Sequence, residues 1–151
     1  MRYPEPLIIP MREDLTRHGV LETRTPEAVD ELLASENGTV LLVINSVCGC
    51  AAGKARPGVV MSLNNEAKPD KVATVFAGAD VEAVAHVREI LADFPPSSPS
   101  VALFKSGKPV YMMHRRDIES RTAPEIAAEL SAAYRHFCAP ADAVGAETSV
   151  Q

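Results

Sequence analysis

The chain has 151 residues, the size of one ordinary domain and long enough to bury a single hydrophobic core. Hydrophobic residues make up 46% of it and charged residues 23%, as in globular proteins, and a net charge of −5 gives no basic footprint for nucleic acid. No apolar run approaches the length of a membrane span, and residues 1–10 lack the pattern of a secretion signal. We therefore expect a cytoplasmic protein that binds neither nucleic acid nor membranes.

The first predicted helix begins after Thr25, whose hydroxyl can cap it, and Pro26 suits its first position. Apolar residues then recur at helical spacing until Asn37-Gly38 ends the helix. Residues 39–46 form a nearly continuous apolar run that is rich in β-branched side chains. Such a run is typical of a strand that is covered on both faces.

The middle of the chain is expected to alternate helix and strand. A helix is predicted from Cys50 to about Ala67, and Pro57 should bend or interrupt it. Residues 72–77 then form a second buried strand. The helix that follows is predicted to be capped by Asp80, and its apolar residues belong to the core rather than to a cofactor site.

The last third of the chain predicts a hairpin and a helix. Two short strands, 101–105 and 109–114, are separated by a three-residue loop, which is typical of an antiparallel pair. Thr122 and Glu125 then have the spacing of a capping box at the start of an amphipathic helix. Residues 139–151 are small and polar, and we expect them to form a disordered tail.

Two thiols separated by one residue, Cys48-Gly49-Cys50, follow the first predicted strand. The N-terminus of a helix carries partial positive charge and unpaired N–H groups, so a thiol there is biased toward the thiolate that attacks disulfides. Cys48 is therefore the expected nucleophile. Cys50 can resolve a mixed disulfide by attacking the sulfur of Cys48, so the pair predicts redox chemistry.

Other uses of the two thiols have less support in the sequence. A closed zinc site needs four ligands, and neither Cys138 nor the 4 histidines show ligand spacing, so no metal is expected. A structural disulfide that closes so small a loop removes little chain entropy and is strained, which favours an exchangeable bond. Three cysteines, an odd number, also differ from a secreted disulfide framework.

The neighbours of the dithiol allow two interpretations each. Lys54 and Arg56 either raise the thiolate content of the pair or lie on a solvated surface, and the surface position is the more common one. Asn45 and Ser46 are expected to end the strand rather than to contact a sulfur. Cys138 is either an additional redox thiol or a core residue, and a lone cysteine on an apolar helix is more often core.

The order of the elements, with the dithiol after the first strand, resembles the thioredoxin fold, an α/β fold in which helices flank a central mixed β-sheet. Ser97-Ser98-Pro99-Ser100 directly precedes the predicted strand 101–105, where thioredoxin-like proteins carry a cis-proline that faces the dithiol. The resemblance implies that Pro99 is cis, which costs about 0.5–1 kcal/mol at an X-Pro bond. It also implies that the backbone of Ser98 is available to a substrate chain.

Several separated segments resemble the bacilliredoxin family. They are Asn45–Gly53, Ala55–Gly58, Thr74–Gly78 and Pro95–Ser100, and Tyr3-Pro4-Glu5 and Pro10-Met11-Arg12 also fit. The chain differs from ordinary thioredoxins because Val47, which is not aromatic, precedes Cys48 and only Gly49 separates the cysteines. The match runs from about Tyr3 to Cys138 and implies one thioredoxin-like domain, residues 1–138, with an N-terminal extension.

The resemblance implies a bacterial thiol–disulfide oxidoreductase that removes bacillithiol, or a similar low-molecular-weight thiol, from mixed disulfides on client proteins. Cys48 would take up this thiol and Cys50 would release it, with Gly49, Ser98 and Pro99 as candidate substrate-binding residues. The small thiol is then a co-substrate, and no bound cofactor is expected. A Cys-x-Cys disulfide is expected to be comparatively oxidising, so disulfide isomerisation is the close alternative. A noncatalytic partner-binding module and a metal chaperone stay open.

Overall fold

The computed structural model describes residues 2–138, so the tail predicted at 139–151 lies outside the described residues. The helices are α1 (Glu5–Thr16), α2 (Pro26–Leu32), η1 (Ser35–Asn37), η2 (Ala51–Ala55), α3 (Arg56–Ser62), α4 (Val81–Ile90), α5 (Arg115–Glu119) and α6 (Ala123–Phe137). The strands are β1 (Leu21–Glu22), β2 (Thr39–Asn45), β3 (Lys71–Phe76), β4 (Ser100–Lys105) and β5 (Lys108–Met113). Within residues 2–138, none of the helices combines the length and hydrophobicity that a membrane span requires.

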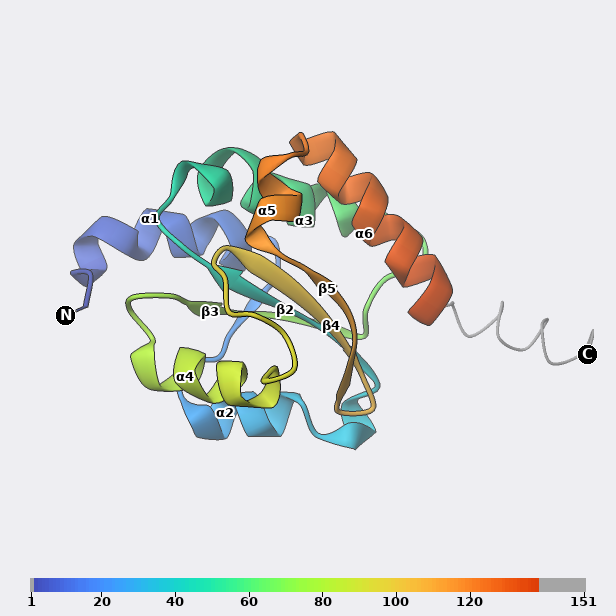
Figure 1. The fold of residues 1–151 in the computed structure, drawn as a ribbon, viewed down its shortest axis with the longest axis horizontal. Coiled ribbons are helices and arrows are strands. Elements are labelled where there is room, and N and C mark those ends of the chain that lie inside the picture. Colours follow the sequence, from blue (N-terminus) through green and yellow to red (C-terminus); the bar gives the residue numbers. More distant parts are fainter. Residues whose placement is uncertain (1, 139–151) are drawn as a thin grey trace, which may run out of the picture.

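The strands form one mixed sheet in the order β1-β3-β2-β4-β5. β3 runs parallel to β1 and β2, whereas β4 is antiparallel to β2 and β5. In Figure 1, α2 and α4 lie on one face of this sheet, and α1, α3, α5 and α6 lie on the other. The predicted α/β plan, a central mixed sheet flanked by helices, is confirmed.

The central strand β2 is buried along its whole length, as its apolar run predicts. Successive side chains of a strand point to opposite faces. Leu41 and Val43 accordingly pack into the core under α3 and α6, while Leu42 and Ile44 pack into the core under α2 and α4. The strand that leads to the dithiol is thus fixed from both sides of the sheet.

The predicted N-terminal caps are confirmed at two helices, α2 and α6. Thr25 Oγ1 accepts a hydrogen bond from the N–H of Ala28 at 3.1 Å, and Thr122 and Glu125 form the reciprocal capping box of α6. The hairpin is also present, but its loop has two residues rather than three because β5 begins at Lys108. Both loop residues, Ser106 and Gly107, have positive φ, which is the geometry that suits a two-residue hairpin.

The helix predicted from Cys50 to about Ala67 is shorter and is divided in two. A π-helical turn, η2, comes first, and the regular helix α3 takes over at Arg56 and ends at Ser62. Pro57 lies in the first turn of α3, where its missing N–H is not needed. Gly58 allows α3 to approach α6 closely, because a Cβ at this position would lie 2.6 Å from Cγ2 of Ile126.

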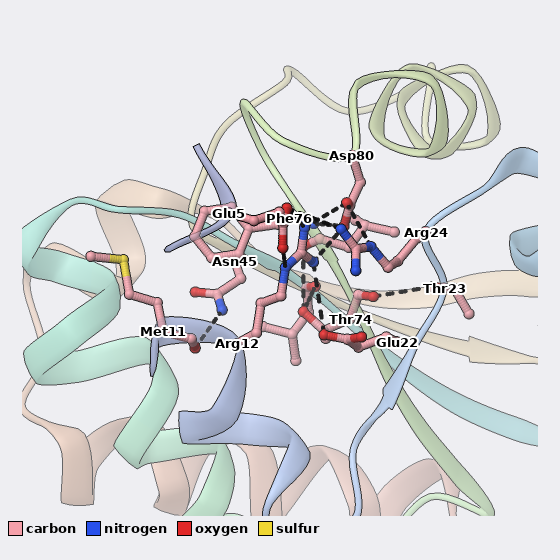
Figure 2. Close-up of polar contacts among 12 residues, drawn as sticks. Glu5, Met11, Arg12, Glu22, Thr23, Arg24, Asn45, Thr74, Phe76 and Asp80 are labelled. Atoms are coloured by element: carbon pink, nitrogen blue, oxygen red, sulfur yellow. Dashed lines mark hydrogen bonds and ion pairs between the residues drawn. The ribbon is translucent and has the colours of Figure 1, made fainter. Parts of the chain in front are cut away.

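Three elements were not predicted: α1, β1 and α5. Figure 2 shows how α1 is attached to the rest of the protein. The two Nη atoms of its buried Arg12 donate to the two carboxylate oxygens of Asp80 at 2.9 and 2.7 Å, and Arg12 also binds Glu5. The predicted capping role of Asp80 is therefore wrong, because this carboxylate accepts from Arg12 and from the N–H of Phe76 instead.

Candidate active site

The Cys-Gly-Cys segment lies between the end of β2 and the π-helical turn η2, with Cys48 in a bend and Gly49 and Cys50 as the first helical residues. Cys48 and Cys50 are half-buried, Gly49 is exposed, and all three cysteines of the described chain are free thiols. A Cβ at Gly49 would meet no other atom within 4 Å, so the space in front of the turn is open. The two sulfurs are thus held at the surface, at one end of the sheet.

The local backbone favours the thiolate of Cys48. Burial raises the pKa of this thiol, but hydrogen bonds from the Ser46 hydroxyl, the N–H groups of Ala51 and Cys50, and the Cys50 thiol together lower it below its ordinary value. The N–H of Cys48 donates in turn to Ser46 Oγ at 3.2 Å. Ser46 therefore both ends the strand and contacts the dithiol, whereas the sequence predicts only the first role.

The environment of Cys50 has the opposite effect. Burial, the nearby carboxylate of Glu119 and the charge of Cys48 all raise the pKa of the Cys50 thiol. The thiol donates to Glu119 Oε2, with a sulfur-to-oxygen distance of 3.5 Å. Cys48 is thus the more acidic thiol of the pair.

The Ser98–Pro99 peptide bond is cis, as the resemblance to thioredoxin-like proteins implies. Ser100 pairs with Ile44 near the end of β2, which places the buried Pro99 at the same end of the sheet as the turn that carries the cysteines. The carbonyl of Ser98 accepts a hydrogen bond from Nη1 of Arg115 at 3.3 Å. This carbonyl is therefore engaged by an exposed side chain, whereas we expected it to be free.

The short helix α5 connects the cis-proline segment to the dithiol. Nε of Arg115 is 3.3 Å from Oε2 of Glu119, the oxygen that accepts from Cys50. Nζ of Lys54 donates to the main-chain carbonyl of Glu119, so Lys54 holds α5 rather than a sulfur. Sequence reasoning missed Arg115 and Glu119, because their i,i+4 spacing indicates a helical ion pair and nothing in it points to the cysteines.

A groove of about 400 Å³ runs along α5 on the side of the cis-proline segment. Its walls are Pro95–Ser97, His114–Arg116 and Glu119. Two arginines and one carboxylate leave the groove with an excess of positive charge. It is joined to Cys50 through Glu119, so a molecule bound in it would lie close to the dithiol.

Arg56 lies beneath the turn and is buried, so the surface position favoured for it was wrong. Its Nη1 donates to Asn45 Oδ1 at 3.0 Å and to the Ser46 carbonyl at 2.9 Å, and its Nε is 3.1 Å from Asp14 Oδ2. Burial lowers the pKa of Arg56, while the charges of Asp14 and Cys48 act to raise it. A buried cation thus interacts favourably with the Cys48 thiolate.

The same contacts join α1 to the turn that carries the cysteines. Asn45 Nδ2 donates to the main-chain carbonyl of Met11 at 3.2 Å (Figure 2), and Asn45 Oδ1 accepts from the N–H of Ser46. Asp14, also on α1, pairs with Arg56. Through these contacts the N-terminal helix supports the end of β2.

Cys138 lies at the other end of the central strand. It is buried in the core at the end of α6, and its thiol contacts Thr39, the first residue of β2. Burial raises the pKa of Cys138. At about 3.3 Å per residue, the seven residues of β2 separate this thiol from the dithiol by roughly 20 Å. The position of Cys138 favours packing over a redox role.

Among residues 2–138, no group of three or more His, Cys, Asp or Glu side chains is arranged to hold a metal ion.

Comparison with known proteins shows the family to which the chain belongs. The family model described as "Disulphide isomerase" matches residues 3–138. A bacilliredoxin of Koribacter versatilis is 48% identical over 136 residues, which cover 90% of this chain and 94% of that protein.

The chain belongs to the bacilliredoxin family. A second relative, a bacilliredoxin of Salinibacter ruber, is 50% identical over 149 residues, which cover 95% of this chain and 88% of the relative. Together with the thioredoxin fold, this membership makes the protein a thiol–disulfide oxidoreductase.

Solved structures agree on the fold. Malassezia sympodialis thioredoxin superimposes with a TM-score of 0.55 at 16% identity, covering 80% of this chain and 92% of that one. Fasciola hepatica thioredoxin superimposes with a TM-score of 0.54 at 16% identity, covering 78% of this chain and 99% of that one. At such low identity the likeness concerns the fold, and the thioredoxin-like architecture is thereby shown.

Proposed function

We propose that this bacilliredoxin removes a low-molecular-weight thiol, bacillithiol or a close analogue, from mixed disulfides on client proteins. The thiolate of Cys48 attacks the sulfur of the small thiol, the mixed disulfide breaks, and the client leaves as a free thiol. Cys50 then attacks Cys48, releases the small thiol and leaves a Cys48–Cys50 disulfide. The small thiol acts as a co-substrate and not as a bound cofactor.

The observation that carries this proposal is the difference between two thiols only one residue apart. Cys48 receives hydrogen bonds that favour its thiolate, whereas Cys50 lies beside a carboxylate that favours its protonated form. Attack requires a thiolate, and resolution requires a second thiol that stays out of the first step. The opposite directions of the two pKa shifts favour this division of roles.

The surroundings of the dithiol support a large client and a small anionic thiol. Gly49 leaves open space in front of the turn, which suits the approach of a client disulfide. We propose that Gly49, Ser98 and Pro99 form the substrate-binding part of the site. The buried Pro99 positions the backbone of Ser98, and a substrate chain would replace the exposed Arg115 side chain at the Ser98 carbonyl. The groove beside them has Arg115 and Arg116 in its wall, which suits a thiol that carries carboxylates.

Disulfide isomerisation is a second candidate function. It is favoured by the description of the family model that matches residues 3–138. The same attack by Cys48 would start it, but the mixed disulfide would be resolved by another cysteine of the client. The two functions therefore differ in which thiol attacks Cys48 in the second step.

We further propose that the protein works in the cytoplasm. Three free thiols, two of them accessible at the surface, are compatible with a reducing compartment. In such a compartment the oxidised enzyme can be returned to the dithiol by other cellular thiols.

Replacement of each cysteine of the pair tests the proposal. Cys48→Ser should abolish release of the client thiol, because the nucleophile is lost. Cys50→Ser should still attack and should accumulate as a Cys48 mixed disulfide with the small thiol. After incubation with bacillithiol-modified and glutathione-modified clients, intact-mass spectrometry identifies the preferred thiol, and peptide mapping identifies the modified cysteine.

Cys138→Ser is the matched control, because it removes a thiol at the far end of β2. In the Cys50→Ser background, this change should leave the lifetime of the mixed disulfide unaltered. Equal client release by wild type and Cys48→Ser would contradict the proposal. Isomerisation would be favoured if the Cys48 mixed disulfide of Cys50→Ser accumulates with clients that have one cysteine but not with clients that have several.

A further inference from the structure

Glu119 contacts a reacting atom of the proposed mechanism. Its Oε2 is 3.5 Å from the sulfur of Cys50 and accepts the hydrogen bond of that thiol. The same oxygen is 3.3 Å from Nε of Arg115, which fixes the carboxylate in place. The main chain of Glu119 is held separately by Lys54, so the side chain is free to change its protonation state without loss of that contact.

The second step of the reaction requires that Cys50 lose its proton. The environment of this thiol keeps it protonated at neutral pH, since its pKa is raised by burial, by Glu119 and by Cys48. A protonated thiol attacks a disulfide poorly, because the thiolate is the nucleophile. The proton must therefore leave Cys50 as its sulfur approaches Cys48.

We propose that Glu119 is the catalytic base that accepts the proton of Cys50 during resolution of the mixed disulfide. This inference rests on the proposed role of Cys50 as the resolving thiol. A base must lie within hydrogen-bond reach of the proton that it removes. In the mixed disulfide the Cys48 sulfur is no longer a thiolate that accepts from Cys50, and the Glu119 carboxylate remains as the acceptor, 3.5 Å from the sulfur.

The step balances in protons and electrons. As the Cys50 S–H bond breaks, the proton passes to Oε2 of Glu119 and the sulfur forms a bond to Sγ of Cys48. The bond between Cys48 and the small thiol breaks, and that thiol leaves as a thiolate with the electron pair. In this step Cys50 is oxidised and the small thiol is reduced, while Cys48 stays a disulfide sulfur, and Glu119 later returns its proton to solvent.

Stopped-flow reaction of the reduced protein with one equivalent of dithiobis-nitrobenzoate separates the two steps, because each release of this aromatic thiol is coloured. The first release reports attack by Cys48 and the second reports resolution by Cys50. In Glu119→Gln the first phase should keep its rate. The second phase should slow roughly tenfold or more, toward the 10²–10⁴-fold that a general base commonly supplies.

The pH profile distinguishes proton transfer from a change in thiol acidity. The charged and titratable groups that interact with Cys50 are Cys48, Glu119 and Arg115, and the ammonium group of Lys54 binds the main chain of Glu119 beside them. Without the base, the second phase of Glu119→Gln should rise with pH until Cys50 ionises by itself, and should approach the wild-type rate in alkaline solution. Glu119→Asp keeps the charge but retracts it by one methylene. The rate of its second phase should lie between those of wild type and Glu119→Gln.

Glu36→Gln is the matched control, because it removes an exposed carboxylate from η1, at the opposite end of β2, and should alter neither phase. A second phase in Glu119→Gln that is unchanged or faster at neutral pH would overturn the inference and leave Glu119 as an electrostatic restraint on Cys50. Absence of a second phase in wild type would overturn it as well. Neither result depends on bacillithiol, so failure of the proposed function, seen with modified clients, is a separate outcome.

Discussion

Two arginine–carboxylate clusters in this protein contain the same chemical groups and differ in their exposure. The side chains of Arg12 and Asp80 retain 5% and 3% of their accessible surface, whereas those of Arg115 and Glu119 retain 45% and 47%. Buried charges must stay paired, because an unpaired one costs several kcal/mol, while exposed pairs exchange readily with water. The buried cluster therefore stabilises the fold, and the exposed one is suited to proton exchange at the dithiol.

The largest effect is expected from breaking the buried cluster. Asp80→Ala leaves the guanidinium of Arg12 without its bidentate partner and removes the acceptor for the N–H of Phe76. Loss of one partner of a buried pair typically costs about 3–5 kcal/mol. Urea denaturation of the reduced protein should show this loss as a lower midpoint.

The double variant Arg12→Met, Asp80→Ala serves as its control, because it removes both charges and should recover part of the stability. A loss below about 1 kcal/mol in Asp80→Ala, the range of surface pairs, would mean that the flanking carboxylates Glu5 and Glu22 satisfy Arg12 alone.

A smaller effect is expected at Arg56, which is buried like Arg12 but interacts with the dithiol. Its positive charge favours the Cys48 thiolate, so Arg56→Met should raise the pKa of Cys48. The attack rate rises with pH and levels off above that pKa, which in wild type is lowered from the ordinary value of a thiol. The rate of the variant should therefore level off at a higher pH than that of wild type.

Alkylation rates measured against pH, with peptide mapping of the modified cysteine, test this shift. Arg56→Lys keeps the charge and loses most of the hydrogen bonds to Asn45 and Ser46, so it should preserve more of the low pKa than the methionine variant. An unchanged profile in Arg56→Met would assign the acidity of Cys48 to the turn alone.

The smallest effect on stability is expected at Arg115, in the exposed cluster. Arg115→Ala should leave the urea midpoint unaltered, because the ion pair with Glu119 is solvated. It should nevertheless slow the second coloured release by a few-fold, and by less than Glu119→Gln does, since the carboxylate loses its orientation. Arg135→Ala on α6 is the control for loss of an exposed arginine. A clearly lower urea midpoint in Arg115→Ala would mean that the exposed cluster also stabilises the fold, which would contradict the difference drawn between the two clusters.

Local patterns in the sequence were sufficient for much of the fold. Thr25 and the Thr122–Glu125 box act within a few residues of their partners, so their roles can be predicted from spacing alone. The cis bond before Pro99 required family resemblance in addition, since a proline at the start of a strand is ordinarily trans.

Contacts between distant segments account for what was missed. Asp80 has the position of a cap, but its partner Arg12 is 68 residues away in the sequence. Glu119 and Cys50 are 69 residues apart, and α5 has only five residues, too few for a helical pattern to be recognised. A helix that contains a proline, as α1 contains Pro10, is equally hard to predict, because an interior proline ordinarily argues against a helix.

The close approach of Gly58 to Ile126 ties the dithiol and the base to the same core. Gly58 lies in α3, the helix that follows the cysteines, and even one added methyl group there would collide with the Ile126 side chain of α6. The short helix that carries the base is anchored in this core by the fully buried Ile118, and its main chain is also held by Lys54. The nucleophile and the base are therefore positioned by one shared core, on the side of the sheet that α6 covers.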